Sequence, residues 1–166
     1  MRSSELSLCF SARCGAANMN QPTQPTARGL EKRDLAIRQL RRAVQLFNQG
    51  DFVCAATLAG AAEEILGRIA QKRTGATALD GHAHFWSQLA GIVGKSPPDR
   101  KKVVEANNRL RNQLKHNDSG DNEWVSADFE FEAQDLIDRA IRNYWLAYDI
   151  PPADRVINHY VDFHWT

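Results

Sequence analysis

The residues best suited to chemistry lie between Asn108 and His116. Arg111, Asn112 and His116 place a guanidinium, a carboxamide and an imidazole within about two turns of a helix, since each residue advances ~100° around the axis. Arginine binds phosphate oxygens through a planar, permanently charged fork, and histidine can give or accept a proton near neutral pH. On a helical wheel these residues, with Asn108 and Lys115, lie away from an apolar stripe. We therefore expect them to face away from the core of the bundle.

This set of side chains suits cleavage of a phosphodiester without a metal. One imidazole would take the proton of a ribose 2′-hydroxyl while the guanidinium stabilises charge on the phosphate. Because DNA lacks that hydroxyl, the predicted substrate is RNA. In-line transfer needs a base and an acid on opposite sides of the phosphate, whereas one helix supplies a single imidazole. A two-fold dimer would supply both, so we predict a homodimer that needs no cofactor.

The same segment is basic, although the formal net charge of the whole chain is only +1. Residues 100–116 contain six Lys or Arg and one acid, whereas residues 117–138 contain eight acids and no Lys or Arg. Lys101, Lys102 and Arg109 are therefore expected to contact the phosphates of RNA, together with Lys115. The alternative is a solvated helix face balanced by an acidic neighbour.

The elements that must position these residues are helices joined by short loops. Apolar residues recur at helical spacing over five segments, and no alternating strand pattern occurs. The segments are 30–49, 52–72, 83–93, 99–116 and 126–148. The sequence predicts an all-α fold, an up-and-down bundle of four to five helices. Its first two helices should form an antiparallel hairpin with a tight turn at 48–51, where Asp51 can cap the second helix.

The chain divides into three parts by composition. Residues 1–29 are polar, contain Pro22 and Pro25 and show no apolar period, so we expect a disordered tail. Residues 30–150 should form the helical bundle domain. Residues 151–166 are rich in aromatic side chains and are expected to dock as a C-terminal arm or a short helix.

The expected compartment follows from the cysteines and from hydropathy. Three cysteines are an odd number, which favours a reducing compartment, and no run of ~18 apolar residues exists. A signal peptide is the alternative at the N-terminus, but Ser7 interrupts its short apolar stretch and Glu5 lies where basic residues belong. We therefore expect a cytoplasmic protein with no membrane contact.

The segment Arg111-Asn112-Gln113-Leu114-Lys115-His116 resembles the signature of HEPN domains, in which an Arg, a polar residue and a few others precede a His. The preceding segment, Ala43–Leu66, resembles the first two helices of that family, and the resemblance covers about residues 35–148. It implies a helical bundle, often dimeric, whose Arg and His meet at the dimer cleft. Many members are metal-independent endoribonucleases in toxin–antitoxin, phage-defence or RNA-processing systems.

By that resemblance, Arg111, Asn112 and His116 form the catalytic set, and an antitoxin or a nucleotidyltransferase is the implied partner. Some toxins of the family carry a Tyr two residues after the His, which a partner enzyme modifies. This chain has Asp118 there, so that regulation is not expected. Other members have lost activity and bind nucleotides or partners. The alternative function is therefore a non-catalytic helical module that binds RNA, a nucleotide or a partner protein.

Several other polar residues have more than one interpretation. Glu63 or Glu64 could contact Arg111, although a structural ion pair or solvent exposure is the commoner use of such residues. Cys54 lies on an Ala-rich helix and is expected to be a buried small hydrophobe.

A metal site is not predicted. His82 and His84 form a His-x-His pair in an expected loop, with Asp80 nearby. Without a third placed ligand this spacing is a weak signal for a metal, so the metal ligands are expected to be none.

Overall fold

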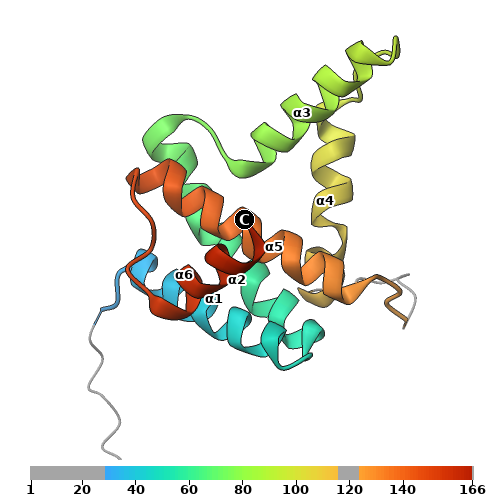
Figure 1. Ribbon diagram of the computed structural model, residues 1–166. Helices are drawn as coiled ribbons and strands as arrows, with labels where there is room; N and C mark the ends of the chain where they lie inside the picture. The colour runs from blue at the N-terminus through green and yellow to red at the C-terminus, as the bar shows by residue number, and fades with distance from the viewer. Residues whose placement is uncertain (1–28, 116–123, 166) are drawn as a thin grey trace, which may run out of the picture.

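The computed structural model describes residues 29–115 and 124–165 of the chain. The predicted tail, residues 1–29, therefore lies almost entirely outside the described residues. The described part contains six helices and no strand, which confirms the all-α prediction (Figure 1). The helices are α1 (Lys32–Asn48), α2 (Phe52–Thr74), α3 (Ala78–Ile92), α4 (Arg100–Lys115), α5 (Phe129–Tyr148) and α6 (Arg155–His164).

The first two helices form the predicted hairpin. Gly50 occupies the tight turn with a φ of 79°, a left-handed conformation that glycine adopts without a Cβ penalty. The Asp51 side chain then accepts a hydrogen bond from the backbone N–H of Cys54 at 3.2 Å, which caps α2. Cys54 itself is exposed, so the prediction of a buried thiol is wrong. It lies in the first turn of α2 on the outer face, whereas Ala55 and Ala56 face the core.

The core forms where α5 packs along α2, with α1 beside them. The buried positions of α2 are mainly alanines and glycines, so the two helices can approach closely. Bulkier side chains from α5, Leu136, Ile137 and Ile141, fill the space above them. Burying one such side chain contributes ~1.5–3 kcal/mol, so these three residues stabilise the contact between α2 and α5.

The C-terminal segment docks as a short helix, α6. Asp154 caps it by accepting hydrogen bonds from the N–H groups of Val156 and Ile157 at 3.0 and 3.3 Å. The same carboxylate accepts a hydrogen bond from Arg41 of α1 at 2.6 Å, which ties α6 to the hairpin. Ile157 is buried in the core.

Helix α3 begins five residues earlier than the sequence predicts. Thr77 and Asp80 form a capping box, in which each side chain binds the backbone N–H of the other residue. The expected loop at 73–82 is therefore wrong over its second half. Helices α3 and α4 rise from the rest of the bundle (Figure 1), and only Ala78 and Ala83 of α3 are buried.

None of the helices in the described part of the chain has the length and apolar character that crossing a bilayer requires.

Candidate functional site

Arg111 lies against α2 and does not face away from the bundle as expected. A Cβ on Gly60 of α2 would lie only 2.9 Å from Cγ of Arg111, so the glycine makes room for this side chain. One residue earlier on α4, Leu110 is buried in the core. The expectation of an outward Arg111 is wrong because α4 packs on α2 where that helix presents a small residue and a carboxylate. A helical wheel of α4 contains no information about the small residue or the carboxylate on α2.

That carboxylate belongs to Glu63, and it forms an ion pair with Arg111. Nη1 of Arg111 lies 2.7 Å from Oε2 of Glu63, and the two side chains are 16% and 4% exposed. Within the described part of the chain, Nε of Arg111 is buried and has no hydrogen-bond partner. Removing one partner of a buried pair costs ~3–5 kcal/mol, so Glu63 holds the guanidinium in place.

Asn143 of α5 forms hydrogen bonds with residues on two other helices near the site. Its side chain is buried, and its Oδ1 accepts a hydrogen bond from the N–H of Ala78 at 2.8 Å. Its Nδ2 donates to the carbonyl oxygen of Glu63 at 3.5 Å. One amide therefore joins the start of α3 and the middle of α2 through α5.

A second ion-pair cluster lies one turn further along α4. Nζ of Lys115 donates to Oε2 of Glu64 at 2.6 Å, and Arg68 donates to Oε1 of the same carboxylate at 2.8 Å. The hydrogen bond from Lys115 lowers the pKa of Glu64, although partial burial opposes it. Glu64 is therefore a carboxylate at neutral pH, shared by two cations.

Lys115 and Glu64 also line a groove of about 670 Å³ along α1 and α2. We call it the basic groove, because four cations and one acid line it. Its lining residues are Lys32, Leu35, Ala61, Glu64, Ile65, Arg68, Ile69, Lys72 and Lys115. The lining combines apolar and cationic side chains, a combination that suits a ligand carrying phosphates next to apolar or aromatic groups.

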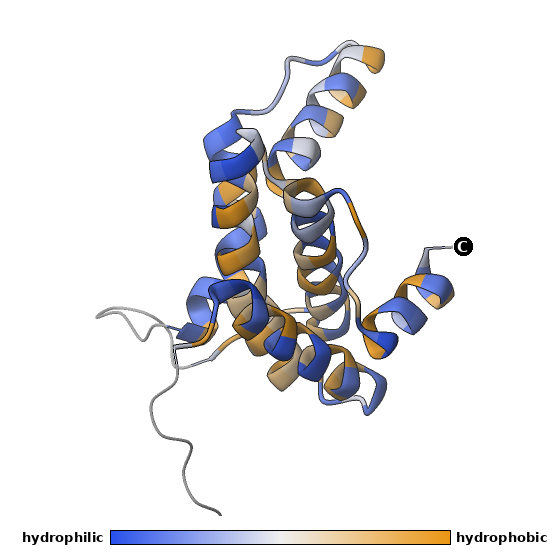
Figure 2. Ribbon diagram, turned by 90° about the vertical axis from the view of Figure 1, so that its left-hand side faces the viewer, coloured by the Kyte–Doolittle hydropathy of each residue, from blue (hydrophilic) through white to orange (hydrophobic). Residues whose placement is uncertain are grey.

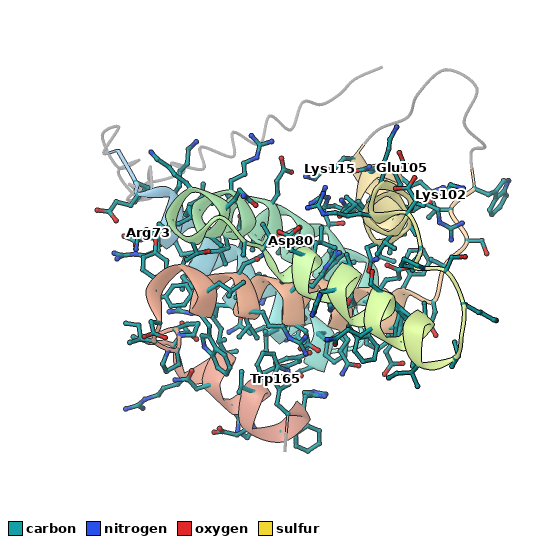
Figure 3. The ribbon with its side chains drawn as sticks, turned by 90° about the horizontal axis from the view of Figure 1, so that it is seen from above. Arg73, Asp80, Lys102, Glu105, Lys115 and Trp165 are labelled. Carbon is teal, nitrogen blue, oxygen red and sulfur yellow. The ribbon has the colours of Figure 1, made fainter. Side chains whose placement is uncertain are left out.

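The remaining predicted site residues are spread around α4. Asn112 is exposed, and Oδ1 of Asn108 is buried without a hydrogen-bond partner among the described residues. Lys101 is exposed and lies 3.8 Å from Glu105 across one turn. Figure 3 shows Lys102, Glu105 and Lys115 around α4, seen almost along the helix axis.

Arg109 and Lys102 do not share a face with Arg111. They lie ~160–180° from it on the helix, given ~100° per residue. Both are exposed. The structure thus brings Arg111 and Lys115 together against α2 and leaves these two cations on the opposite side. His116 follows α4 directly and lies outside the described residues, so the position of its imidazole stays a prediction.

The sequence interpretation missed three cations of the basic groove, Lys32, Arg68 and Lys72. They lie on α1 and α2, which had been assigned only to the core hairpin. The signal was present as a spacing: Arg68 and Lys72 follow Glu64 at intervals of four, so one face of α2 carries all three.

Asp80, the acidic residue beside the His-x-His pair, is engaged in hydrogen bonds with other residues. Thr77 and Arg100 both donate hydrogen bonds to this carboxylate. Burial raises the pKa of Asp80, but these hydrogen bonds outweigh it and lower the pKa overall. No group of three or more His, Cys, Asp or Glu that could hold a metal ion occurs in residues 29–115 and 124–165.

Comparison with known proteins found no matching family, no matching curated protein and no matching solved structure. The functional interpretation therefore rests on the residues of this chain and their geometry.

Proposed function

We propose that this protein is a HEPN-like, metal-independent endoribonuclease that acts as a homodimer. The observation that carries the proposal is Arg111, a guanidinium held by Glu63 one turn from Lys115 and the basic groove. A fixed cation beside a cationic groove suits an RNA phosphate in a defined position. As part of the same proposal, the protein works in the cytoplasm with an antitoxin or nucleotidyltransferase partner, as the resemblance implies.

The proposed reaction is attack by a ribose 2′-oxygen on the adjacent phosphorus. The bond between phosphorus and O2′ forms and the bond between phosphorus and O5′ breaks, which leaves a 2′,3′-cyclic phosphate and a 5′-hydroxyl. One imidazole takes the proton of the 2′-hydroxyl and a second, from His116 of the other copy, gives a proton to O5′. Arg111 stabilises the extra negative charge on the phosphate oxygens, and Asn112 orients the phosphate or the imidazole.

In this proposal Glu63 is a positioning residue. Its carboxylate engages Nη1 of Arg111 from the α2 side. The side chain of Arg111 is 16% exposed, and a phosphate oxygen would contact that exposed part of the guanidinium. The cations of the basic groove, Lys32, Arg68, Lys72 and Lys115, contact the flanking phosphates.

The test uses the full chain and an end-labelled single-stranded RNA. We expect cleavage that resists EDTA, yields 2′,3′-cyclic phosphate ends and stops when the nucleotide at the cut carries a 2′-deoxyribose. His116→Ala should lower cleavage by ~10²–10⁴-fold. Arg111→Ala should lower it by ~30–10³-fold, equivalent to ~2–4 kcal/mol. His159→Ala is the matched control, because His159 is exposed on α6, and it should cleave like the wild type.

Binding is measured separately, by fluorescence anisotropy in the His116→Ala background. Arg68→Glu with Lys72→Glu should weaken RNA binding and reduce its dependence on salt. The control is the same charge reversal at Arg42 and Arg155, each changed to Glu. These residues lie beside a different groove, so RNA binding should change little.

The second candidate function is a non-catalytic module that binds RNA or a nucleotide. It is favoured by the ion pair of Arg111 with Glu63, because this pair weakens the charge available for catalysis while the cations of the basic groove can still bind phosphates. It predicts equal RNA binding by the wild type and His116→Ala, with no turnover by either. That result would reject the nuclease proposal.

A further inference from the structure

Helix α3 presents an apolar face to solvent along most of its length. Phe85, Leu89 and Ile92 are spaced as neighbours on one side of a helix, and Trp86 and Val93 lie beside them. From Phe85 onward no residue of α3 is buried. Figure 2 shows apolar segments along α3 out to its far end. Such a stripe normally faces a core, and here the described helices leave it uncovered.

This face continues onto α5 across a groove. Phe85 of α3 and Trp145 and Leu146 of α5 line a cavity of about 980 Å³ between the start of α3 and the end of α5. We call the combined patch the α3 apolar surface. It consists of Phe85, Trp86, Leu89, Ile92, Val93, Trp145 and Leu146.

The size of the patch decides what it can do. Its seven side chains are between 36% and 81% exposed. The three aromatic members offer ~150–250 Å² each and the four aliphatic members less, so at these exposed fractions an average member exposes on the order of 100 Å² and the patch about 700 Å². The largest apolar patch on a typical monomer is ~300–600 Å², whereas a standard protein interface takes ~800 Å² from each partner. The patch therefore has the dimensions of one half of a protein interface.

The charges around the patch indicate the kind of partner. Asp80 is the only charged residue of α3, which has no Lys or Arg. A helix that binds a membrane surface or a nucleic acid carries basic residues on its polar face, so both are disfavoured. The groove has one Arg, Arg142, together with Asp80 and Asp149. A surface that carries both signs can meet its own copy with unlike charges opposed.

We propose that the α3 apolar surface binds the same surface of a second copy of this chain, forming a two-fold dimer. In this dimer α3 of each copy lies over the groove between α3 and α5 of the other. Two patches of about 700 Å² give about 1,400 Å² in total, within the ~1,200–2,000 Å² of stable interfaces. The proposal is argued from this surface alone and does not rest on the proposed function.

The test is the mass of the full chain in solution, by sedimentation equilibrium or light scattering. The wild type should be a dimer, and Phe85→Asp and Ile92→Asp, each made separately, should be monomers. Because both side chains are exposed in a single copy, the variants should keep the helical circular dichroism of the wild type. Phe131→Asp is the matched control: Phe131 is 66% exposed, against 58% for Phe85, but lies at the start of α5. It should remain a dimer.

A wild type that is monomeric at about 100 μM would overturn the proposal, since a standard-size apolar interface should associate at that concentration. Variants that remain dimeric, or a control that dissociates equally, would overturn it as well. If Phe85→Asp does not fold, Ile92→Asp at the far end of α3 decides the question. A dimer that cleaves no RNA would reject the proposed nuclease and leave this interface standing. Monomeric variants that still cleave RNA would support the interface and exclude a dimeric active site.

Discussion

The ion pair between Glu63 and Arg111 makes a sharp prediction about stability, because a matched control is its neighbour in the chain. Glu63→Gln keeps the shape of the side chain and removes its charge. It leaves a guanidinium that is only 16% exposed without its counter-ion. Breaking a fully buried pair costs ~3–5 kcal/mol, and the exposed edge of Arg111 lowers that figure to ~2–4 kcal/mol.

Glu64→Gln removes a carboxylate from the adjacent position. The Glu64 side chain is 35% exposed, and its partners Lys115 and Arg68 both reach water. Exposed pairs contribute ~0.2–1 kcal/mol, so this variant should be nearly as stable as the wild type. The two variants carry the same chemical change, so the difference between their stabilities reflects chiefly how deeply each ion pair is buried.

The assay is urea unfolding followed by circular dichroism, with thermal melts in parallel. One kcal/mol corresponds to ~2–4 °C in a domain of this size, so Glu63→Gln should lower Tm by ~4–16 °C. The double variant Glu63→Gln with Arg111→Met should recover part of the loss, because the uncompensated cation is gone. Equal stability of the two single variants, or a double variant that recovers nothing, would refute the role given to this pair.

Two further predictions concern packing and pH. Gly60→Ala should destabilise the protein by up to ~2 kcal/mol, since overpacking against Arg111 costs ~1–3 kcal/mol and the gain in helix propensity is ~1 kcal/mol. Gly81→Ala has open space around its new Cβ and should stabilise the protein by ~0.5–1 kcal/mol. If urea unfolding shows Gly60→Ala to be more stable than Gly81→Ala, the close approach of Gly60 to Arg111 is contradicted. Burial raises the pKa of Asp138, although hydrogen bonds from two aromatic donors oppose it, so stability is lost as pH rises through that pKa. Asp138→Asn keeps the accepting oxygen and should match or exceed the wild type in urea unfolding at pH 7, with the difference shrinking below about pH 4, and a difference that grows toward acid pH would contradict this.

Local signals predicted most of the helical framework. The apolar period, the Asp51 cap and the glycine turn at Gly50 placed α1 and α2, and the same period placed α5 to within three residues. These features depend on contacts within a few residues along the chain, so the sequence contains them directly. The start of α3 was missed because its capping box, Thr77 and Asp80, was interpreted as part of a loop.

The residue types and spacing of the candidate site could be recognised without coordinates, but its surroundings could not. Arg111 and Glu63 are 48 residues apart, and the glycine that admits Arg111 also lies on α2. A helical wheel shows which residues of α4 share a face, but it does not show which helix packs against each face. The same limit applies to the apolar stripe of α3, whose spacing is that of a core helix.

The sequence by itself determined that the chain is helical and that one helix carries a guanidinium, a carboxamide and a following imidazole. Apolar periodicity, helix caps and helix-breaking residues act over a few residues, so they can be recognised in the sequence. Only the tertiary structure decided that Arg111 is paired with Glu63 against α2, and that α3 leaves its apolar face uncovered by the described helices. Those outcomes depend on how helices distant in sequence are oriented about one core, which the pattern of any single helix does not specify.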